Sequence, residues 1–170
     1  VARAHVVVMD LATGALAAYV STDAASFPPD RAYPAASLVK VVTAAAALDA
    51  APSLVNGTCR FAGSPYVLTP SRVNPPKRGA EISLERALAT SNNQCFAQWA
   101  VHRVGARGLL DAIERFGFLS SPAPDHPPGD VKDPGDSAYA LGELGSGLDG
   151  LRITPLHAAQ LAGTLADGRL

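Results

Sequence analysis

The sequence has no long run of apolar residues and no excess of charge of one sign. Its most apolar helix-like stretch, 41–48, stops at Asp49, well short of the roughly 20 residues that span a bilayer. Lys and Arg number 14 against 15 Asp and Glu, a net charge of −1, whereas nucleic-acid binders carry a basic excess. The residues therefore contain no membrane span and predict no nucleic-acid partner. A hydrophobic content of 48% over 170 residues suits one folded domain.

Cysteine is also scarce. Cys59 and Cys95 are too few for a disulfide scaffold, and their spacing matches no zinc pattern, so their redox state and the compartment stay open. We interpret Cys95 as a small buried hydrophobe, with a free thiol lining a cleft as the less common alternative. The N-terminal residues do not form a signal peptide, so we expect an excised mature segment.

Strand-like segments are few. Residues 5–20 predict an antiparallel hairpin whose turn contains Gly14, a residue that takes positive φ readily. Apolar periodicity and capping residues predict helices at 37–50, 83–89, 94–104, 108–116 and 154–167. Two stretches rich in Pro and Gly, 51–80 and 119–150, are expected to be irregular. The predicted fold class is α/β of the α+β kind, mainly helical with an N-terminal antiparallel hairpin. Because a lone two-stranded ribbon is marginal in water, we expect further strands of its sheet to be missing from this chain.

The predicted helix at 37–50 begins in an unusual way. Ser37 is at a typical N-cap position, but Lys40 stands where a capping box has Glu or Gln. A cation in the first turn opposes the helix dipole and is costly to bury. Positions three apart share a helix face, so Lys40 can reach the Ser37 hydroxyl, and burial would lower the lysine pKa. The pair is a candidate nucleophile and general base. The alternative is an ordinary serine cap followed by a lysine that extends to solvent.

A second candidate site is the Ser-x-Asn triplet that begins at Ser91, in a polar break between two predicted helices. In a functional interpretation the Ser91 hydroxyl lies in a proton path, and the Asn93 amide contacts Lys40 and a substrate amide. In the structural alternative Asn93 is the N-cap of helix 94–104, because Ser and Asn are common at caps and in turns.

Other chemically suggestive residues have simpler interpretations. No histidine lies in a nucleophile-elbow context, and we interpret His102 and His157 as packing or surface residues. Residues 124–136 lack the spacing of a calcium-binding loop, so we interpret them as a solvated loop. Phe96 and Trp99, at helical spacing, are expected in the core. We predict no metal and no cofactor.

Taken together, these segments resemble the transpeptidase domain of penicillin-binding proteins, the serine acyltransferases that cross-link peptidoglycan. The segments that carry the resemblance occur in the order of the family, at 5–21, 31–48, 79–105, 114–118 and 142–168. The resemblance implies that Ser37 is the acylated nucleophile and Lys40 its proton acceptor. It also implies that Ser91 helps to shuttle the proton and that Asn93 holds Lys40 and the acyl side chain.

The resemblance implies a two-step reaction. The serine attacks a D-Ala-D-Ala peptide bond and releases the last D-alanine, and an amine of a neighbouring stem peptide then takes the acyl group. Peptidoglycan stem peptides and β-lactam antibiotics are the implied partners, outside the cytoplasmic membrane, with a membrane anchor expected elsewhere in the protein. Alternatives on the same fold are a D,D-carboxypeptidase or a serine β-lactamase. An alternative of another class is a non-catalytic module that binds β-lactams or peptidoglycan.

The third motif of the family, Lys-Thr/Ser-Gly, does not occur in these residues. We therefore expect 1–170 to be the N-terminal part of a single transpeptidase domain that is weak or inactive alone. The missing strand would supply one oxyanion donor, whose loss costs roughly 3–4 kcal/mol of transition-state stabilisation. Without its neighbouring strands, hairpin 5–20 would present an unpaired apolar edge, which predicts a dimer or aggregate through this hairpin.

Overall fold

The computed structural model describes residues 3–168, which fold as two compact units built from non-contiguous segments. Of the described residues, 3–33, 114–130 and 152–168 form the first unit, and 34–113 and 131–151 form the second. The chain passes between the units four times. One passage is near the end of α4 (Gly105–Arg115), and three are within the short strands β3 (Tyr33–Pro34), β6 (Asp130–Val131) and β7 (Leu151–Ile153). Helices combined with small antiparallel sheets agree with the predicted fold class.

The first unit contains the predicted N-terminal hairpin. Strand β1 (His5–Met9) pairs with β2 (Leu16–Ser21) in an antiparallel register that places Val6 opposite Val20. Gly14 in the connecting turn has the expected positive φ, +72°. Because residues directly opposite each other in paired strands point to the same face, Val6 and Val20 share one face of the hairpin, and both are about half exposed. A dimer through this hairpin stays a prediction.

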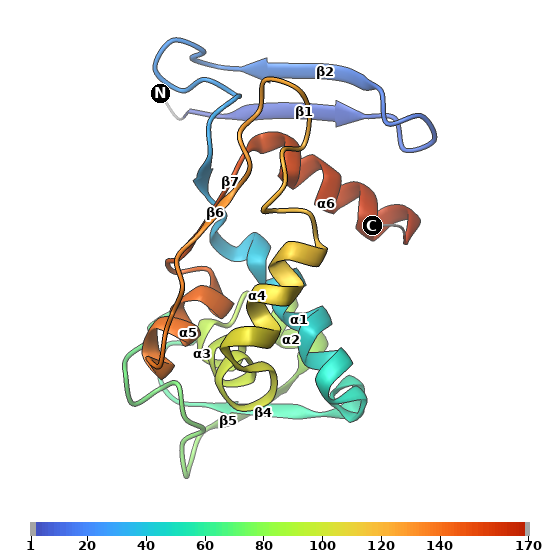
Figure 1. The fold of residues 1–170 in the computed structure, drawn as a ribbon. Coiled ribbons are helices and arrows are strands. Elements are labelled where there is room, and N and C mark those ends of the chain that lie inside the picture. The colour runs from blue at the N-terminus through green and yellow to red at the C-terminus, as the bar shows by residue number, and fades with distance from the viewer. Residues whose placement is uncertain (1–2, 169–170) are drawn as a thin grey trace. The chain divides into compact units, whose positions relative to one another are not determined.

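The hairpin packs against α6 (Pro155–Asp167), which Figure 1 shows running alongside β1. Gly163 allows the close approach, since a Cβ at this position would lie 3.0 Å from Cε of Met9. The helix lies where the sequence predicts it: Thr154 is its N-cap, and Gly168, with φ +74°, ends it.

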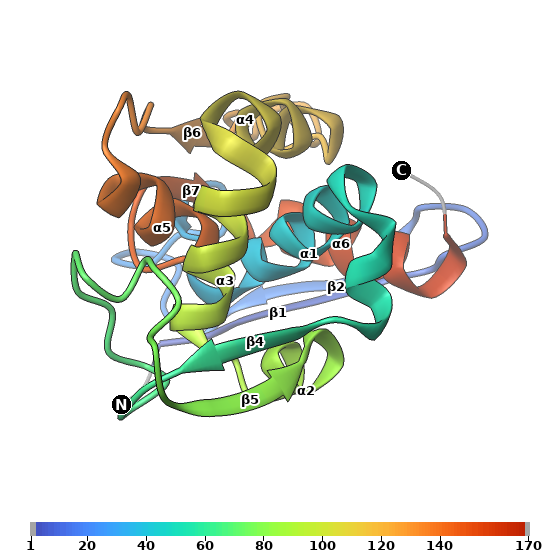
Figure 2. The same cartoon turned by 90° about the horizontal axis from the view of Figure 1, so that it is seen from below.

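The second unit holds most of the helices. Its elements in chain order are η1 (Ala36–Leu38), α1 (Val39–Ala50), η2 (Pro52–Asn56), β4 (Thr58–Phe61), β5 (Ala80–Ser83), α2 (Leu84–Ala89), α3 (Asn93–Trp99), the π-helical turn η3 (Ala100–Val104), α4 (Gly105–Arg115) and α5 (Ala138–Ser146). The last two residues of α4 belong to the first unit. Helices α2 and α3 pack against the antiparallel β4–β5 ribbon (Figure 2), and α1, α2, α3 and β4 enclose an apolar core that includes Phe96 and Trp99.

The structure corrects the expectation that residues 51–80 and 119–150 are irregular. The first stretch contains η2 and strand β4, which pairs with β5, and the second contains β6 and α5. The β4–β5 ribbon was missed because 18 residues, 62–79, separate its strands, so no short turn marks it. Helix α5 was missed because its glycines and the flanking Pro and Asp residues are typical of loops.

Cys95 is buried, as the sequence predicts, but it is not a free thiol, and its redox state was left open by the sequence. Cys95 of α3 forms a disulfide with Cys59 of β4, across 36 positions of sequence. Both cysteines are buried, at 0% and 4% exposure, within the core between α3 and β4. In the chain-entropy model a crosslink of this kind stabilises a fold by about 2–4 kcal/mol.

Candidate active site

Ser37 lies in the single turn η1 that precedes α1, and its side chain is exposed. The structure does not support its interpretation as a helix cap, because neither η1 nor α1 has a side-chain capping bond and the N-cap residue of α1 is Leu38. Ala36, immediately before the serine, has φ +48°, an uncommon conformation for a residue with a side chain. Ser37 is thus presented at the surface by a strained turn rather than used to start the helix.

Lys40 is almost completely buried, at 1% exposure, so it does not extend to solvent as the structural alternative requires. Its Nζ lies 2.8 Å from Oγ of Ser37 and 2.6 Å from the carbonyl oxygen of Ser146, and it also lies 5.9 Å from the centre of the Phe96 ring. Burial lowers the pKa of Lys40 to about 8, because desolvation disfavours the ammonium form. At pH 7 about a tenth of this lysine is therefore a neutral amine beside a serine hydroxyl, far more than for an ordinary lysine.

Ser91 completes a chain of three polar groups. Its Oγ donates a hydrogen bond of 2.9 Å to Oγ of Ser37, although the two residues are 54 positions apart. Ser91 has φ +53°, in the left-handed region, which costs on the order of 1–3 kcal/mol for a residue other than glycine. Next to it, Asn92 caps α3 by accepting a bond from the Cys95 amide, so the cap is one residue earlier than predicted. The strained Ser91 between two helices is held so that its hydroxyl meets Ser37.

Asn93 is beside this chain of groups but makes its recorded bonds elsewhere. Its amide nitrogen donates to the carbonyl oxygen of Tyr66 at 2.8 Å, and its backbone N–H donates to the carbonyl oxygen of Pro65 at 3.0 Å. The structure therefore brings three of the four predicted residues together directly and places Asn93 as the anchor of a neighbouring loop. Its contact with Lys40 stays a prediction.

The sequence reasoning missed the end of helix α5. Besides the bond from Lys40 to Ser146, the Thr43 hydroxyl donates to the carbonyl oxygen of Gly145 at 2.8 Å. These acceptors are backbone atoms, more than 100 positions away from α1, so no side-chain motif marks them. The closely spaced glycines at 142, 145 and 147 were the one available indication of a close helix approach.

These groups suit acyl transfer. In the ammonium form Lys40 donates to both Ser37 and Ser146, and in the neutral form its lone pair accepts the proton of Ser37. The Ser37 oxygen is then a nucleophile open to solvent, and the first turn of the helix supplies backbone N–H groups for an oxyanion. Among the residues that the structure describes, no group of His, Cys, Asp or Glu side chains is arranged to hold a metal ion.

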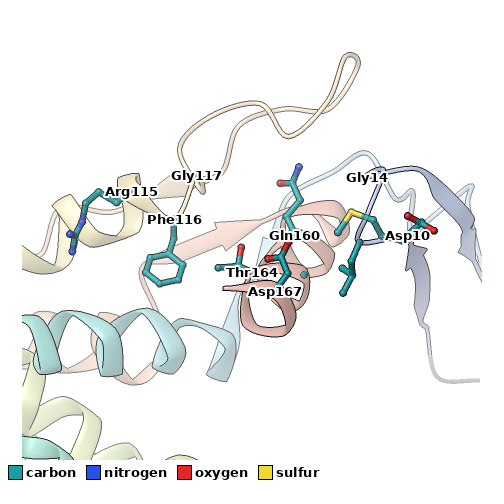
Figure 3. A pocket seen from close by; sticks show the side chains of 11 residues that line it. Asp10, Gly14, Arg115, Phe116, Gly117, Gln160, Thr164 and Asp167 are labelled. Atoms are coloured by element: carbon teal, nitrogen blue, oxygen red, sulfur yellow. The ribbon is translucent and has the colours of Figure 1, made fainter. Parts of the chain in front are cut away.

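A cavity of about 330 Å³ in the first unit contains none of the predicted site residues. Figure 3 shows it between Asp10 and Gly14 at the turn of the hairpin, Thr164 and Asp167 of α6, and Phe116. Within residues 3–168 no helix has both the length and the apolar character needed to cross a membrane.

Comparison with known proteins agrees with this geometry. The family model described as the penicillin binding protein transpeptidase domain matches residues 4–170. The peptidoglycan D,D-transpeptidase PbpA of Mycobacterium tuberculosis is 32% identical over 148 residues, which are 80% of this chain and 29% of PbpA. The chain thus spans less than a third of the length of the curated relative that it matches.

Solved structures give the same result. Penicillin-binding protein A of M. tuberculosis, in a ceftriaxone acyl-enzyme complex, superimposes with a TM-score of 0.66 at 30% identity, over 84% of this chain and 34% of that one. Its imipenem acyl-enzyme complex gives a TM-score of 0.65 at 32% identity, over 81% and 33%. Pseudomonas aeruginosa PBP2, in complex with WCK 5153, reaches 0.77 over 97% of this chain and 47% of that one, at 23% identity, and supports the fold alone.

Proposed function

Because the chain belongs to the family of penicillin-binding protein transpeptidase domains, we propose that it is the N-terminal part of a peptidoglycan D,D-transpeptidase that works through Ser37. The observation that carries the proposal is the hydrogen-bonded chain from Ser91 through Ser37 to Lys40, in which the serine is exposed and the lysine is buried. A structural cap would need neither the buried lysine nor the strained Ser91.

The first step forms an acyl-enzyme. Neutral Lys40 accepts the proton of the Ser37 hydroxyl while the serine oxygen bonds to the carbonyl carbon of the D-Ala-D-Ala peptide bond. The tetrahedral intermediate then collapses and the C–N bond breaks. The proton on Lys40 passes through the Ser91 hydroxyl to the nitrogen of the departing D-alanine, so Lys40 returns to its neutral form.

The second step transfers the acyl group. The amine of a neighbouring stem peptide attacks the ester carbon, loses a proton to Lys40 along the same path, and releases Ser37, which regains its own proton. Asn93 is assigned to the substrate side of the site, where one N–H of its side-chain amide already holds the loop at Tyr66 and its amide oxygen remains available. Its amide oxygen is then the group that meets the acyl side chain.

The same chemistry makes β-lactams ligands of this site, as the acyl-enzyme complexes of M. tuberculosis penicillin-binding protein A suggest by analogy. The protein is placed outside the cytoplasmic membrane, where its peptidoglycan substrate lies. The Cys59–Cys95 disulfide supports this location, because structural disulfides persist in oxidising compartments. A membrane anchor in other parts of the protein remains part of the proposal.

The test is covalent labelling of the full-length protein. Incubation with a fluorescent penicillin is expected to add one ring-opened β-lactam per molecule, and peptide mapping should place it on Ser37. Addition of a donor stem peptide and an acceptor amine should then release D-alanine and form a cross-linked peptide. Absence of an adduct, or an adduct on another residue, would overturn the proposal. Rapid transfer to water in place of the amine would assign the protein to the carboxypeptidase or β-lactamase class.

The isolated 170 residues should label poorly. The motif that supplies a second oxyanion donor in this family does not occur in them, and one lost donor costs roughly 3–4 kcal/mol, or a factor of about 10²–10³ in rate. Rapid stoichiometric labelling of Ser37 in the isolated chain would contradict this expectation.

A further inference from the structure

The C-terminal end of α5 meets the side chains of α1 with two backbone carbonyl groups. The Ser146 oxygen accepts from Nζ of Lys40 at 2.6 Å, and the Gly145 oxygen accepts from Oγ1 of Thr43 at 2.8 Å. The last four carbonyl groups of a helix have no partner within the helix, and together they carry its partial negative charge. The end of α5 is therefore an electronegative surface applied to the lysine of the site.

Glycine makes this approach possible. Gly147 ends α5 in the left-handed conformation, with φ +75° and ψ 24°, and a Cβ there would lie 1.9 Å from the Ala36 carbonyl oxygen. Two residues earlier, a Cβ at Gly145 would lie 2.3 Å from that of Ala100. The Ser146 hydroxyl turns back onto the Gly142 carbonyl oxygen at 2.7 Å, which leaves only the backbone carbonyl of Ser146 directed at the lysine.

The proton transfer creates a need for this surface. When Lys40 takes the proton of Ser37 it becomes an ammonium ion at a position that is 1% exposed. Burial alone lowers the pKa of Lys40, with no contribution from a charged neighbour. Helix α1 and the helices packed against it carry several ionisable side chains, and none of them contributes to the shift of the Lys40 pKa. They are Asp49 of α1, Glu85 and Arg86 of α2, Tyr139 and Glu143 of α5, and His102 and Arg103 of η3. The cation is thus stabilised by dipoles, namely the carbonyl of Ser146 and the face of the Phe96 ring.

We propose that the C-terminal turn of α5, aimed by Gly147, is the counter-charge that lets Lys40 act as the proton acceptor of Ser37. In the neutral amine one N–H bonds to the Ser146 oxygen, which turns the lone pair of Nζ toward the Ser37 hydroxyl. After proton transfer the same bond becomes charge-assisted, and such bonds are shorter and roughly twice as strong. Gly147 is then a positioning residue. This inference rests on the proposed function, since it concerns the same site.

A purely structural role for the α5 end predicts different behaviour. If the bond only holds α5 on α1, a disturbance at Gly147 lowers stability and leaves the proton affinity of Lys40 unchanged. If the carbonyl stabilises the ammonium form, the same disturbance lowers the pKa of Lys40 and makes it a weaker base. The pH profile of acylation separates these cases.

The experiment compares Gly147→Ala with Gly168→Ala in the full-length protein, by stopped-flow acylation with a β-lactam from pH 5.5 to 9.5. Gly168 is a matched control because it ends α6 with nearly the same backbone, φ 74° and ψ 14°, and a Cβ there meets no atom within 4 Å. For Gly147→Ala we expect the acylation rate at the high-pH plateau to be about tenfold lower. We also expect the acid limb of the profile, in which the rate rises with pH, to lie about one pH unit lower, as for loss of a hydrogen bond to a charged group. For Gly168→Ala we expect the wild-type plateau and limb.

A wild-type acid limb in folded Gly147→Ala, whatever its plateau, would overturn the inference. If Gly147→Ala does not fold, Thr43→Val provides the test, because it removes the neighbouring bond to Gly145 without adding a longer side chain. It should slow acylation about threefold and move the limb in the same direction, by a smaller amount. Thr43→Val with the wild-type rate and limb would equally refute the inference.

These outcomes are distinct from failure of the proposed function. If the wild-type protein forms no adduct on Ser37, the function itself is wrong. If the wild-type protein labels Ser37 normally and the Gly147 and Gly168 variants share one pH profile, only the role of α5 is wrong.

Discussion

Two helices of this protein begin with the same local arrangement, a hydroxyl residue followed three positions later by a buried base. At α1 the pair is Ser37 and Lys40, with Oγ and Nζ 2.8 Å apart, and at α6 it is Thr154 and His157, with Oγ1 and Nδ1 2.9 Å apart. Lys40 and His157 are each 1% exposed, and burial lowers the pKa of both. Sequence spacing and burial of the base do not distinguish the two pairs.

The difference lies in the hydroxyl and in the remaining partners of the base. Thr154 is fully buried and forms a capping box with His157, whose Nδ1 accepts from the Thr154 backbone N–H and whose Nε2 donates to the Ser120 carbonyl oxygen. Ser37 caps nothing and is exposed. A hydroxyl beside a buried base is available for reaction when the hydroxyl itself faces solvent, as at Ser37. With both groups buried and bonded to backbone it is a cap.

The largest effect should come from removal of the exposed hydroxyl. Ser37→Ala eliminates the atom that becomes acylated, so we expect no covalent penicillin adduct by intact-mass measurement of the full-length protein. Thr154→Ala serves as the counterpart and should keep the adduct on Ser37. An adduct that forms in Ser37→Ala at the wild-type rate would remove the distinction between the two pairs.

Removal of the base should have the next largest effect. Lys40→Met keeps the length and much of the volume of the side chain but accepts no proton, so acylation should fall about 10²–10⁴-fold, the usual contribution of a general base. His157→Gln, at the corresponding position of α6, should acylate at the wild-type rate. Stopped-flow acylation measures both, and a Lys40→Met rate within a factor of about three of wild type would contradict the assignment of Lys40.

The pH dependence should follow the pKa of Lys40. Below a pKa of about 8 the lysine is mostly ammonium and cannot take the proton of Ser37, and above it the lysine is neutral. The acylation rate should therefore rise with pH, by about tenfold between pH 7 and its plateau, in proportion to the neutral fraction. A rate that is flat from pH 6 to 9 would show that Lys40 does not titrate in this step.

The smallest effect concerns the pair at α6. Thr154→Ala removes a buried cap and should lower the free energy of unfolding by about 1–2 kcal/mol, measured by urea denaturation. Ser83→Ala, which removes the less buried cap of α2, should lower it by about 0.5–1 kcal/mol. A loss for Thr154→Ala no larger than that for Ser83→Ala would indicate that burial of the cap contributes little.

The parts of the site that are local in sequence could be predicted, and the distant ones could not be derived from the residues alone. Ser37 and Lys40 lie on one helix turn, so their contact follows from helical spacing. The contact of Ser91 with Ser37, across 54 positions, rested on the family resemblance. Neither route indicated Ser146, because its contribution is a backbone carbonyl brought to Lys40 by tertiary packing.

The same limit applies to the fold. The N-terminal hairpin and α6 have short turns and clear caps, and both were predicted. The β4–β5 ribbon joins strands that are separated by a long loop, and the Cys59–Cys95 disulfide joins residues 36 positions apart. The alternation of apolar and polar residues in such short strands is too brief to reveal their pairing.

The buried disulfide also determines how the protein should be prepared. Because Cys59 and Cys95 are enclosed by the core that they join, an oxidant must reach both thiols before that core closes. Material made in a reducing cytosol would fold first and then oxidise slowly or incompletely, whereas export or refolding under a thiol–disulfide buffer lets the bond form while the chain is open. Samples from the two routes should differ in the fraction of molecules in which Ser91, four residues before Cys95, contacts Ser37. Kinetic measurements should therefore use the oxidised fraction.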